Sequence, residues 1–453
     1  MTEPKYQLMR TLRCKDINQP GVLGRLATTI GVAGANIGNI KTVSLGHKYV
    51  VRDLAIFVDD EVHLDCVLQS IAKLAGVTLL EVRDEVLELH QGGKIKMVST
   101  VQVDSVAVLR KVYTPGVADV CRRIQKDTSL KHVYTSISNS VAIVTDGTRV
   151  LGLGNIGPAA GMPVMEGKAA LLQQLAGLSG IPILLSTTDT EDIVNTIKHI
   201  SSTFGGIQLE DIASPRCFDI YARLHDELDV PMMHDDQQGT SVVTLAAVLN
   251  ACKITGIDIK KAVIGQIGLG AAGLVIAEML FKFTGNPVLG TARSEASMKR
   301  HEARGGIAAS QSEIMKKADV VVGCSGVKGL IAPESVRRSQ VIFALTNPEP
   351  EIEPAVALKR GAALAADGKS INNLLGFPGI WRGTLDSRAS RINEQMLVAA
   401  ALAISQQTPE NELMPYILDL KLHRAVSQAV ARAAMESGVA RHLLDEDYFE
   451  GRQ

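Results

Sequence analysis

Two acidic pairs have the clearest capacity for chemistry in this sequence. Glu210-Asp211 and Asp235-Asp236 each follow a short apolar run. Carboxylates gathered in one place repel one another unless a cation lies between them, and hard oxygen ligands of this kind suit Mg²⁺ or Mn²⁺. The two pairs therefore predict a divalent metal site, provided that the fold brings them together.

The elements around the pairs predict that it does. A strand over 206–209, a helix from Pro215 to about Leu228 and a strand over 230–233 form a βαβ unit, and Ser214 before Pro215 is typical of a helix start. The strands of such a unit are parallel, so both pairs lie at one carboxyl edge, where open α/β sheets bind ligands. The alternative is two unrelated acidic helix starts, favoured by the helix dipole.

Two further side chains that could act on a substrate precede the acidic pairs. Tyr113 lies before a Thr-Pro-Gly helix start, and the alternative role for it is a packed ring with a satisfied hydroxyl. Lys168 lies early in an otherwise apolar helix, where it either loses affinity for its proton or extends its amine to water. Between them, residues 141–151 are predicted to form a hairpin around an Asp-Gly turn.

A glycine-rich loop indicates a nucleotide site. The strand over 261–267 leads into Gly268-x-Gly270-x-x-Gly273, and a helix follows to about Lys282. This is the context that the dinucleotide fingerprint requires, because the glycines let the backbone approach a pyrophosphate at the amino end of the helix. The alternative is a glycine turn that binds no nucleotide.

The next predicted strand bears on the choice between NAD and NADP. An acidic residue at its end would bind the ribose 2′-hydroxyl of NAD, but residues 287–294 contain none. Arg293 and Ser294 stand near that position instead and suit a 2′-phosphate. We therefore predict a preference for NADP over NAD.

The amino-terminal 90 residues predict a separate small module. Their pattern is strand, helix, strand, strand, helix, strand from Tyr6 to about Leu89, which is a ferredoxin-like order. The turn over 16–21 and the segment 34–37 resemble the ACT domain, a family of small-ligand regulatory modules that pair across a sheet edge. The resemblance implies an effector, often an amino acid, at exposed helix amides that suit a carboxylate. The alternative is a dimerisation module without a ligand.

The central part of the chain resembles the malic enzyme family. Four blocks, at 113–118, at 151–157 with 165–168, at 209–212 and at 234–240, occur in the order and spacing of that family, and the resemblance extends over about residues 100–400. It implies oxidative decarboxylation of L-malate to pyruvate and CO₂, with reduction of NADP or NAD and with Mg²⁺ or Mn²⁺ as the metal.

The resemblance also implies a role for individual residues. Lys168 would be the general base, Tyr113 the general acid, and Asp235 would hydrogen-bond Lys168. The implied metal ligands are Glu210, Asp211 and Asp236. The implied substrate-binding residues are Arg149, Asn347 and Asn373, with Asn347 also beside the nicotinamide and with the choice between Asn372 and Asn373 open. The implied nucleotide-binding residues are Gly268, Gly270, Ala271, Ala272, Gly273, Arg293 and Ser294.

Composition excludes several classes of protein. The formal net charge of −1 over 453 residues, without a dominant basic tract, argues against a nucleic-acid partner. Hydrophobic residues make up 46% of the chain, yet no apolar run approaches the ~18 residues that span a bilayer. The amino terminus lacks the apolar core of an export signal, and six scattered cysteines suit reduced thiols, so we expect a cytoplasmic protein without a membrane partner.

The sequence thus predicts an α/β protein of three parts. These are an ACT-like regulatory module of βαββαβ order over 1–90, an α/β catalytic domain over 91–240, and a Rossmann-type NAD(P)-binding domain with carboxyl-terminal helices over 241–453. A homodimer or higher homo-oligomer is expected from the two resemblances. The alternatives are a malolactic-type enzyme, a decarboxylating dehydrogenase of another 2-hydroxy acid, and a ligand-sensing regulator with an inactive enzyme half.

Overall fold

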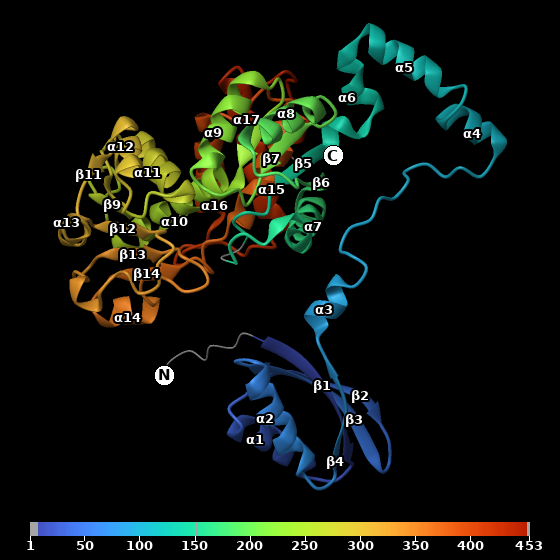
Figure 1. Cartoon of the computed structure of the whole chain (residues 1–453), viewed down its shortest axis with the longest axis vertical. Helices are drawn as coiled ribbons and strands as arrows, with labels where there is room; N and C mark the ends of the chain where they lie inside the picture. The colour runs from blue at the N-terminus through green and yellow to red at the C-terminus, as the bar shows by residue number, and fades with distance from the viewer. Residues whose placement is uncertain (1–7, 151–152, 451–453) are drawn as a thin grey trace. The chain divides into compact units, whose positions relative to one another are not determined.

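The computed structural model describes residues 8–150 and 153–450. The chain forms two compact units, of which the first ends at Lys96 and the second begins at Met97. Figure 1 shows the helices and strands of both. None of the helices in the described ranges combines the length and the apolar run needed to cross a membrane.

The first unit has the predicted βαββαβ order, and its sheet is antiparallel with strand order β2-β3-β1-β4. A hydrophobic cluster that includes Leu12, Leu26 and Val67 joins the sheet to both helices. The predicted start at Tyr6 lies outside the described residues. The elements are β1 (Leu8–Ile17), α1 (Val22–Val32), β2 (Asn36–Leu45), β3 (Tyr49–Val58), α2 (Glu61–Ala72), β4 (Val77–Arg83) and, after the sheet, α3 (Glu85–His90).

The second unit contains a parallel four-stranded sheet with strand order β6-β5-β7-β8. Its strands are β5 (Ser140–Thr145), β6 (Ser179–Leu184), β7 (Gly206–Leu209) and β8 (Met232–His234). Its helices are α7 (Gly157–Ala176), α8 (Thr190–Ser201), α9 (Arg216–Glu227) and α10 (Thr240–Thr255). The predicted βαβ unit is confirmed, because β7 and β8 are parallel neighbours and Leu209 lies opposite His234. Both acidic pairs therefore leave the sheet at the same edge.

The predicted hairpin over 141–151 is wrong. Strand β5 has parallel neighbours on both sides, β6 and β7, so neither of its edges is free for an antiparallel return strand. The chain instead turns at Asp146 and Gly147, and Val150 forms an isolated bridge with Gly154. Leu151 lies outside the described residues. An Asp-Gly turn marks a change of direction, but only the neighbouring strands decide where the chain goes next.

A second parallel sheet has six strands in the order β11-β10-β9-β12-β13-β14, which is the doubly wound order of a dinucleotide-binding domain. The strands are β9 (Ile264–Ile267), β10 (Leu289–Thr291), β11 (Ile307–Ala308), β12 (Val320–Gly323), β13 (Val341–Ala344) and β14 (Leu364–Asp367). The helices among them are α11 (Ala271–Thr284), α12 (Glu295–Ala303), α13 (Gln311–Lys317) and α14 (Pro354–Lys359). The Rossmann-type part of the prediction is confirmed.

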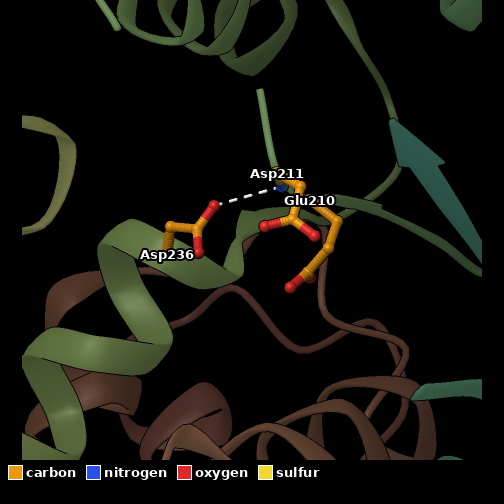
Figure 2. Close-up of side chains that lie close together, drawn as sticks. All are labelled: Glu210, Asp211 and Asp236. Carbon is orange, nitrogen blue, oxygen red and sulfur yellow. Dashed lines mark hydrogen bonds between the residues drawn. The ribbon is translucent and has the colours of Figure 1, made fainter. Parts of the chain in front are cut away.

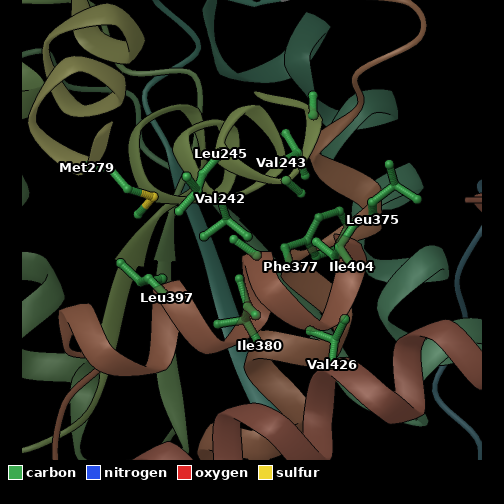
Figure 3. Close-up of a cluster of buried hydrophobic side chains, with 14 of the residues drawn as sticks. Val242, Val243, Leu245, Met279, Leu375, Phe377, Ile380, Leu397, Ile404 and Val426 are labelled. Carbon is green, nitrogen blue, oxygen red and sulfur yellow. The ribbon is translucent and has the colours of Figure 1, made fainter. Parts of the chain in front are cut away.

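The carboxyl-terminal helices hold the two parallel sheets together. They are α15 (Phe377–Asp386), α16 (Glu394–Gln407), α17 (Leu420–Glu436) and the short α18 (Glu446–Glu450). Figure 3 shows their apolar side chains packed against those of α10, including Val242, Phe377, Ile380 and Val426. One hydrophobic cluster thus contains residues from both sheets, so the segment after residue 241 also contributes to the core of the first half.

A helical segment links the first unit to the four-stranded sheet. Its elements are α4 (Val106–Val112), α5 (Val117–Lys126), η1 (Thr128–Leu130), α6 (Lys131–Tyr134) and η2 (Ser136–Asn139). Several of its apolar side chains are exposed, among them Val106, Val133 and Tyr134. Tyr113 follows α4 directly and is 68% exposed.

Candidate active site

Three carboxylates meet at the carboxyl edge of the four-stranded sheet. Glu210 and Asp211 follow β7, and Asp236 lies in the π-helical turn η3 (Asp235–Gly239) that follows β8. One oxygen from each of the three lies within 4.8 Å of the others (Figure 2). The backbone amide of Asp211 donates to Asp236 Oδ2 at 3.1 Å, which connects the two strand ends.

The electrostatics of this cluster suit a divalent cation. Burial, and then the Asp236 carboxylate, raise the pKa of Asp211 to about 7. Burial also raises the pKa of Glu210 well above its usual range, although Lys168 acts in the opposite direction. Asp211 Oδ2 is buried without a hydrogen-bond partner. Hard, crowded and partly unpartnered oxygens are the donor set that Mg²⁺ or Mn²⁺ prefers, so the residues fit the predicted metal.

Lys168 lies beside this cluster rather than extending to water. Its Nζ donates to Glu210 Oε1 at 2.6 Å and to Asp235 Oδ2 at 2.5 Å, and it lies 4.7 Å from the centre of the Phe377 ring. Burial disfavours the charged amine, but the Asp235 and Glu210 carboxylates outweigh it and raise the pKa of Lys168. Helix α7 carries Lys168, so the site combines side chains from a helix and two strand ends.

The Asp235 carboxylate is fixed by two hydrogen-bond donors and by close packing against Gly239. It is fully buried, Lys168 and the Asn373 amide both donate to its Oδ2, and a Cβ on Gly239 would lie 2.0 Å from its Oδ1. Only glycine at position 239 therefore leaves room for this carboxylate. Asn373 is the neighbour that faces the site, since the Asn372 side chain instead accepts from the Leu374 amide.

Two residues that the sequence analysis did not identify position Glu210. The Gln208 amide donates to Glu210 Oε2 at 2.9 Å, and the indole of Trp381 donates to Gln208 Oε1 at 2.6 Å. All three are buried. Gln208 and Glu210 are two residues apart, so their side chains point to the same face. A polar residue within an otherwise apolar strand was the sequence signal that could have identified Gln208. Trp381 lies 173 residues away in sequence from Gln208, and no local pattern indicates that contact.

The other predicted substrate-binding residues are less closely connected to the cluster. The Arg149 amide donates to the Asp211 carbonyl at 3.0 Å, which places Arg149 next to the site with an exposed side chain. Asn347 follows β13. Its side chain packs closely against Gly368, since a Cβ added at Gly368 would lie 2.6 Å from Asn347 Nδ2. Within the described residues, no hydrogen bond or ion pair connects the Tyr113 side chain with Lys168 or the three carboxylates.

The glycine loop has the close packing of a nucleotide fingerprint. Gly268 has a φ of 91°, and a Cβ there would lie 2.6 Å from the Ser325 backbone. A Cβ on Gly273 would lie 2.0 Å from the Gly268 carbonyl oxygen, whereas one on Gly270 would meet nothing within 4 Å. The first and third glycines thus close the turn, and the second leaves open space above the start of α11, where Ala271 and Ala272 follow.

The loop and the acidic cluster belong to one region of the molecule, since η3 packs against α11. Beyond the next strand, β10, Arg293 is exposed and Ser294 caps α12 by accepting from the Ser297 amide. No acidic side chain intervenes between Thr291 and Ser294. The site therefore combines an acidic cluster, a lysine and a dinucleotide-type loop.

Family models match both parallel sheets apart from strand β8. The model described as malic enzyme, N-terminal domain, matches residues 92–225. The model described as malic enzyme, NAD binding domain, matches residues 237–317 and 291–439. These matches include Glu210 and Asp211, whereas Asp236 falls between residues 225 and 237.

Whole-chain relatives agree. The NAD-dependent malic enzyme 1 of Bacillus subtilis (strain 168) is 55% identical over 430 residues, covering 94% of this chain and 98% of the relative. The bifunctional malic/malolactic enzyme of the same organism is 41% identical over 400 residues, covering 81% and 97%. The crystal structure of malic enzyme from Pyrococcus horikoshii Ot3 matches with a TM-score of 0.76 at 38% identity, covering 81% of this chain and 94% of that chain. The chain therefore belongs to the malic enzyme family and is an NAD(P)-dependent malic enzyme.

Proposed function

We propose that this protein catalyses the metal-dependent oxidative decarboxylation of L-malate to pyruvate and CO₂ with reduction of NAD or NADP. The observation that carries the proposal is Lys168, whose amine lies between Glu210 and Asp235 at the border of the three-carboxylate cluster. A proton-transfer group, a cation site and a nucleotide loop are what the reaction requires. The family membership supports the substrate.

The neutral form of the Lys168 amine is proposed to accept the proton of the substrate C2 hydroxyl. The Asp235 and Glu210 carboxylates raise the pKa of Lys168, and a cation held by Glu210 would weaken the effect of that carboxylate and so favour the neutral amine. Asp235 is proposed to orient the Lys168 amine, and Asn373 to orient Asp235, because the Asn373 amide and the Lys168 amine share the same carboxylate oxygen. The reaction removes a hydride from C2 to NAD or NADP, releases the neighbouring carboxylate as CO₂ and adds a proton at C3. Tyr113 is proposed as the acid for that last step, and Arg149 and Asn347 as partners of the substrate carboxylates.

Glu210, Asp211 and Asp236 are proposed to hold the metal. When bound, a divalent cation supplies Lewis-acid polarisation of an oxygen and neutralises the charge of its carboxylate ligands. The unpartnered Asp211 Oδ2 and the raised pKa of Asp211, which burial and Asp236 produce, support this assignment. The Gln208 amide is proposed to keep Glu210 oriented toward the cation.

For the cofactor, we propose that NAD is used at least as well as NADP, which departs from the preference predicted from Arg293 and Ser294. Arg293 is exposed at the end of β10, which suits a 2′-phosphate. The relative that is 55% identical is named NAD-dependent, however, and it covers almost the whole chain. The proposed nucleotide contacts are the amides at Gly268, Gly270, Ala271, Ala272 and Gly273.

A second candidate function is malolactic chemistry, in which lactate is the product. It is supported by the 41% identity to a bifunctional malic/malolactic enzyme. The two reactions differ in their products, because only the oxidative reaction releases pyruvate together with reduced cofactor.

The first unit is proposed to be an ACT-type regulatory module. Its βαββαβ order supports this, as does Gly21, which begins α1 without any side-chain cap and so leaves amides available to a carboxylate. A homodimer or higher homo-oligomer is also proposed. It is supported by the edge strand β2, where Ile40, Val43 and Leu45 are exposed.

The deciding experiment measures the absorbance of reduced nicotinamide with L-malate and Mn²⁺, with NAD and NADP in parallel and an EDTA control. We expect a metal-dependent rise with pyruvate as product. A rise that EDTA does not abolish would contradict the metal assignment. Lactate without net cofactor reduction would favour the malolactic reaction, and kcat/KM at least tenfold higher with NADP would contradict the cofactor proposal.

A further inference from the structure

A separate pocket lies at the opposite edge of the catalytic sheet. It has a volume of about 390 Å³ and is lined near the amino ends of the strands by Ser138, Gly205 and Pro231. Gly205 comes directly before β7 and Pro231 directly before β8, whereas the acidic cluster follows the other ends of these strands. The pocket and the active site are therefore on opposite edges of one sheet.

The lining of this pocket is positively charged. Lys131, His132, Arg388 and Arg441 all line it, and Asp229 is the only acidic side chain among the lining residues. Asp229 pairs with Arg441. The Lys131 amine donates to the Ser202 carbonyl at 3.2 Å. In the part of the chain that the structure describes, neither Lys131 nor Arg388 forms a salt bridge, so no carboxylate neutralises these two positive charges of the pocket lining.

Two further observations describe how this pocket is built. Arg388 ends helix α15 in a left-handed conformation with a φ of 46°, and the Arg388 amide donates to the Leu385 carbonyl while the Ala389 amide donates to the Thr384 carbonyl. His132 Nδ1 is buried without a hydrogen-bond partner. Burial, and then Lys131, Arg388 and Arg441, lower the pKa of His132, so these cations lie near its ring. A bound anion would pair with Lys131 and Arg388.

Helix α15 runs from the active site to this pocket. Its first residue, Phe377, lies under the Lys168 amine, and near its last residue Thr384 and Leu385 line the pocket. In between, the Trp381 indole donates to Gln208, which donates to Glu210. The Trp381 ring also packs against the start of β7, because a Cβ on Gly206 would be 2.2 Å from it, and the preceding residue, Gly205, lines the pocket. A displacement of α15 would thus reach a proposed metal ligand.

We propose that this pocket binds a small multivalent anion carrying phosphate or carboxylate groups, and that occupancy is transmitted along α15 to Glu210. Arginine forks and an ammonium group recognise either anion, so the chemistry is shared between the two sources. The anion would be a regulator of turnover rather than a substrate, since the pocket contains none of the residues proposed for catalysis. The binding part of the proposal does not depend on the proposed reaction.

The chain contains a single tryptophan, so intrinsic tryptophan fluorescence reports on Trp381 alone. The full-length protein is titrated with inorganic phosphate and, separately, with succinate, at ionic strength held constant with chloride. L-malate is present at saturation and nicotinamide cofactor is omitted, so that the catalytic site is occupied. We expect a saturable fluorescence change with at least one probe, and the effective probe identifies the source of the anion.

Arg388→Gln and Lys131→Gln are each expected to weaken the binding of that probe at least about tenfold. The matched control is Arg360→Gln, which removes an exposed arginine of α14's end that pairs with Glu334, and it is expected to leave binding unchanged. Equal binding in wild type and in both pocket variants, with circular dichroism showing that they are folded, would overturn the proposal. So would a lack of any saturable change with either probe.

Discussion

At the scale of single residues, Lys168 is exceptional because it is a nearly buried amine with two carboxylates and an aromatic ring around it. The distances of 2.6 and 2.5 Å to Glu210 and Asp235 leave no room for a water molecule between the charges. Such a group is far more constrained than a lysine at the surface. Its position, rather than its charge alone, supports the role in proton transfer.

Lys168→Ala is expected to lower kcat by about 10²–10⁴-fold, the usual contribution of a positioned acid or base. The measurement is malate-dependent reduction of the nicotinamide cofactor, with a thermal unfolding scan to show that the variant is folded. Lys198→Ala serves as the control, because Lys198 is a surface lysine paired with Glu227. Unchanged turnover in Lys168→Ala would remove this residue from its proposed role.

Tyr113 differs from Lys168 because it is 68% exposed and has no described contact with the cluster. If it supplies the proton at C3, Tyr113→Phe should lower kcat by about 10²–10⁴-fold while leaving the binding of malate nearly intact. Tyr134→Phe is the matched control, an exposed tyrosine of α6. Wild-type turnover in Tyr113→Phe would exclude it as the acid.

The exposure of Tyr113 also allows a test of where it acts. If it serves the site of a second copy, mixing Tyr113→Phe with Lys168→Ala should restore activity that neither variant has, because some mixed dimers would contain one intact site. A mixture as inactive as its components, under conditions of subunit exchange, would mean that both residues act within one chain.

At the scale of elements, the turn η3 depends on a glycine to accommodate Asp235. Gly239→Ala would place a Cβ 2.0 Å from Asp235 Oδ1, and Asp235 cannot move without losing Lys168 and Asn373. We expect a loss of activity of at least about tenfold and destabilisation of about 1–3 kcal/mol from overpacking. Gly161→Ala is the control, since its Cβ would meet only ordinary contacts at 3.6 and 3.7 Å. Equal activity of the two variants would contradict this account.

The link between β7 and α15 gives a second prediction at this scale. Gln208→Leu removes a donor to Glu210 and leaves the Trp381 N–H unpaired, which costs about 1–3 kcal/mol of stability. The concentration of Mn²⁺ needed for half-maximal activity should rise about 10–100-fold, with a smaller change in kcat at saturating metal. Trp381→Phe keeps the bond from Gln208 to Glu210 and should change the metal dependence less. A larger metal effect in Trp381→Phe than in Gln208→Leu would refute the link.

At the scale of the whole molecule, the chain divides at Lys96 and Met97 into a small antiparallel unit and a large unit that contains both parallel sheets. The residues proposed for catalysis all belong to the second unit. The hydrophobic cluster that joins both sheets to α15, α16 and α17 contains no residue of the first unit. Catalysis and the binding of an effector to the first unit are therefore expected to be separable.

Deletion of residues 1–96 should leave kcat within about twofold of the full-length value, because no proposed catalytic residue and no part of the main core is removed. Any change of activity that a panel of amino acids causes in the full-length enzyme should disappear. The measurement compares both proteins at subsaturating malate. A full effector response in the truncated enzyme would locate the regulatory site in the second unit.

Much of this architecture follows from local patterns. The alternation of the first unit, the acidic pairs after β7 and β8 and the glycine spacing before α11 all act within a few residues, so the sequence predicts them directly. The prediction of a hairpin over 141–151 was wrong because the pairing of that strand is not decided by residues close to it in the chain. An Asp-Gly turn is a local signal, but the partners of β5 come from β6 and β7, which lie elsewhere in the chain.

The sequence by itself determined the types of most elements, the parallel pairing of β7 with β8 and the glycine loop before α11, because strands, helix starts and nucleotide loops are specified by neighbours in the chain. Only the tertiary structure decided that Asn373 rather than Asn372 faces Asp235, that Trp381 supports Gln208, and that Arg388 shares a pocket with Lys131. These contacts join residues far apart in sequence. They depend on how helices α15 to α17 pack on the sheets, and packing of that kind leaves no periodic or compositional trace in the chain.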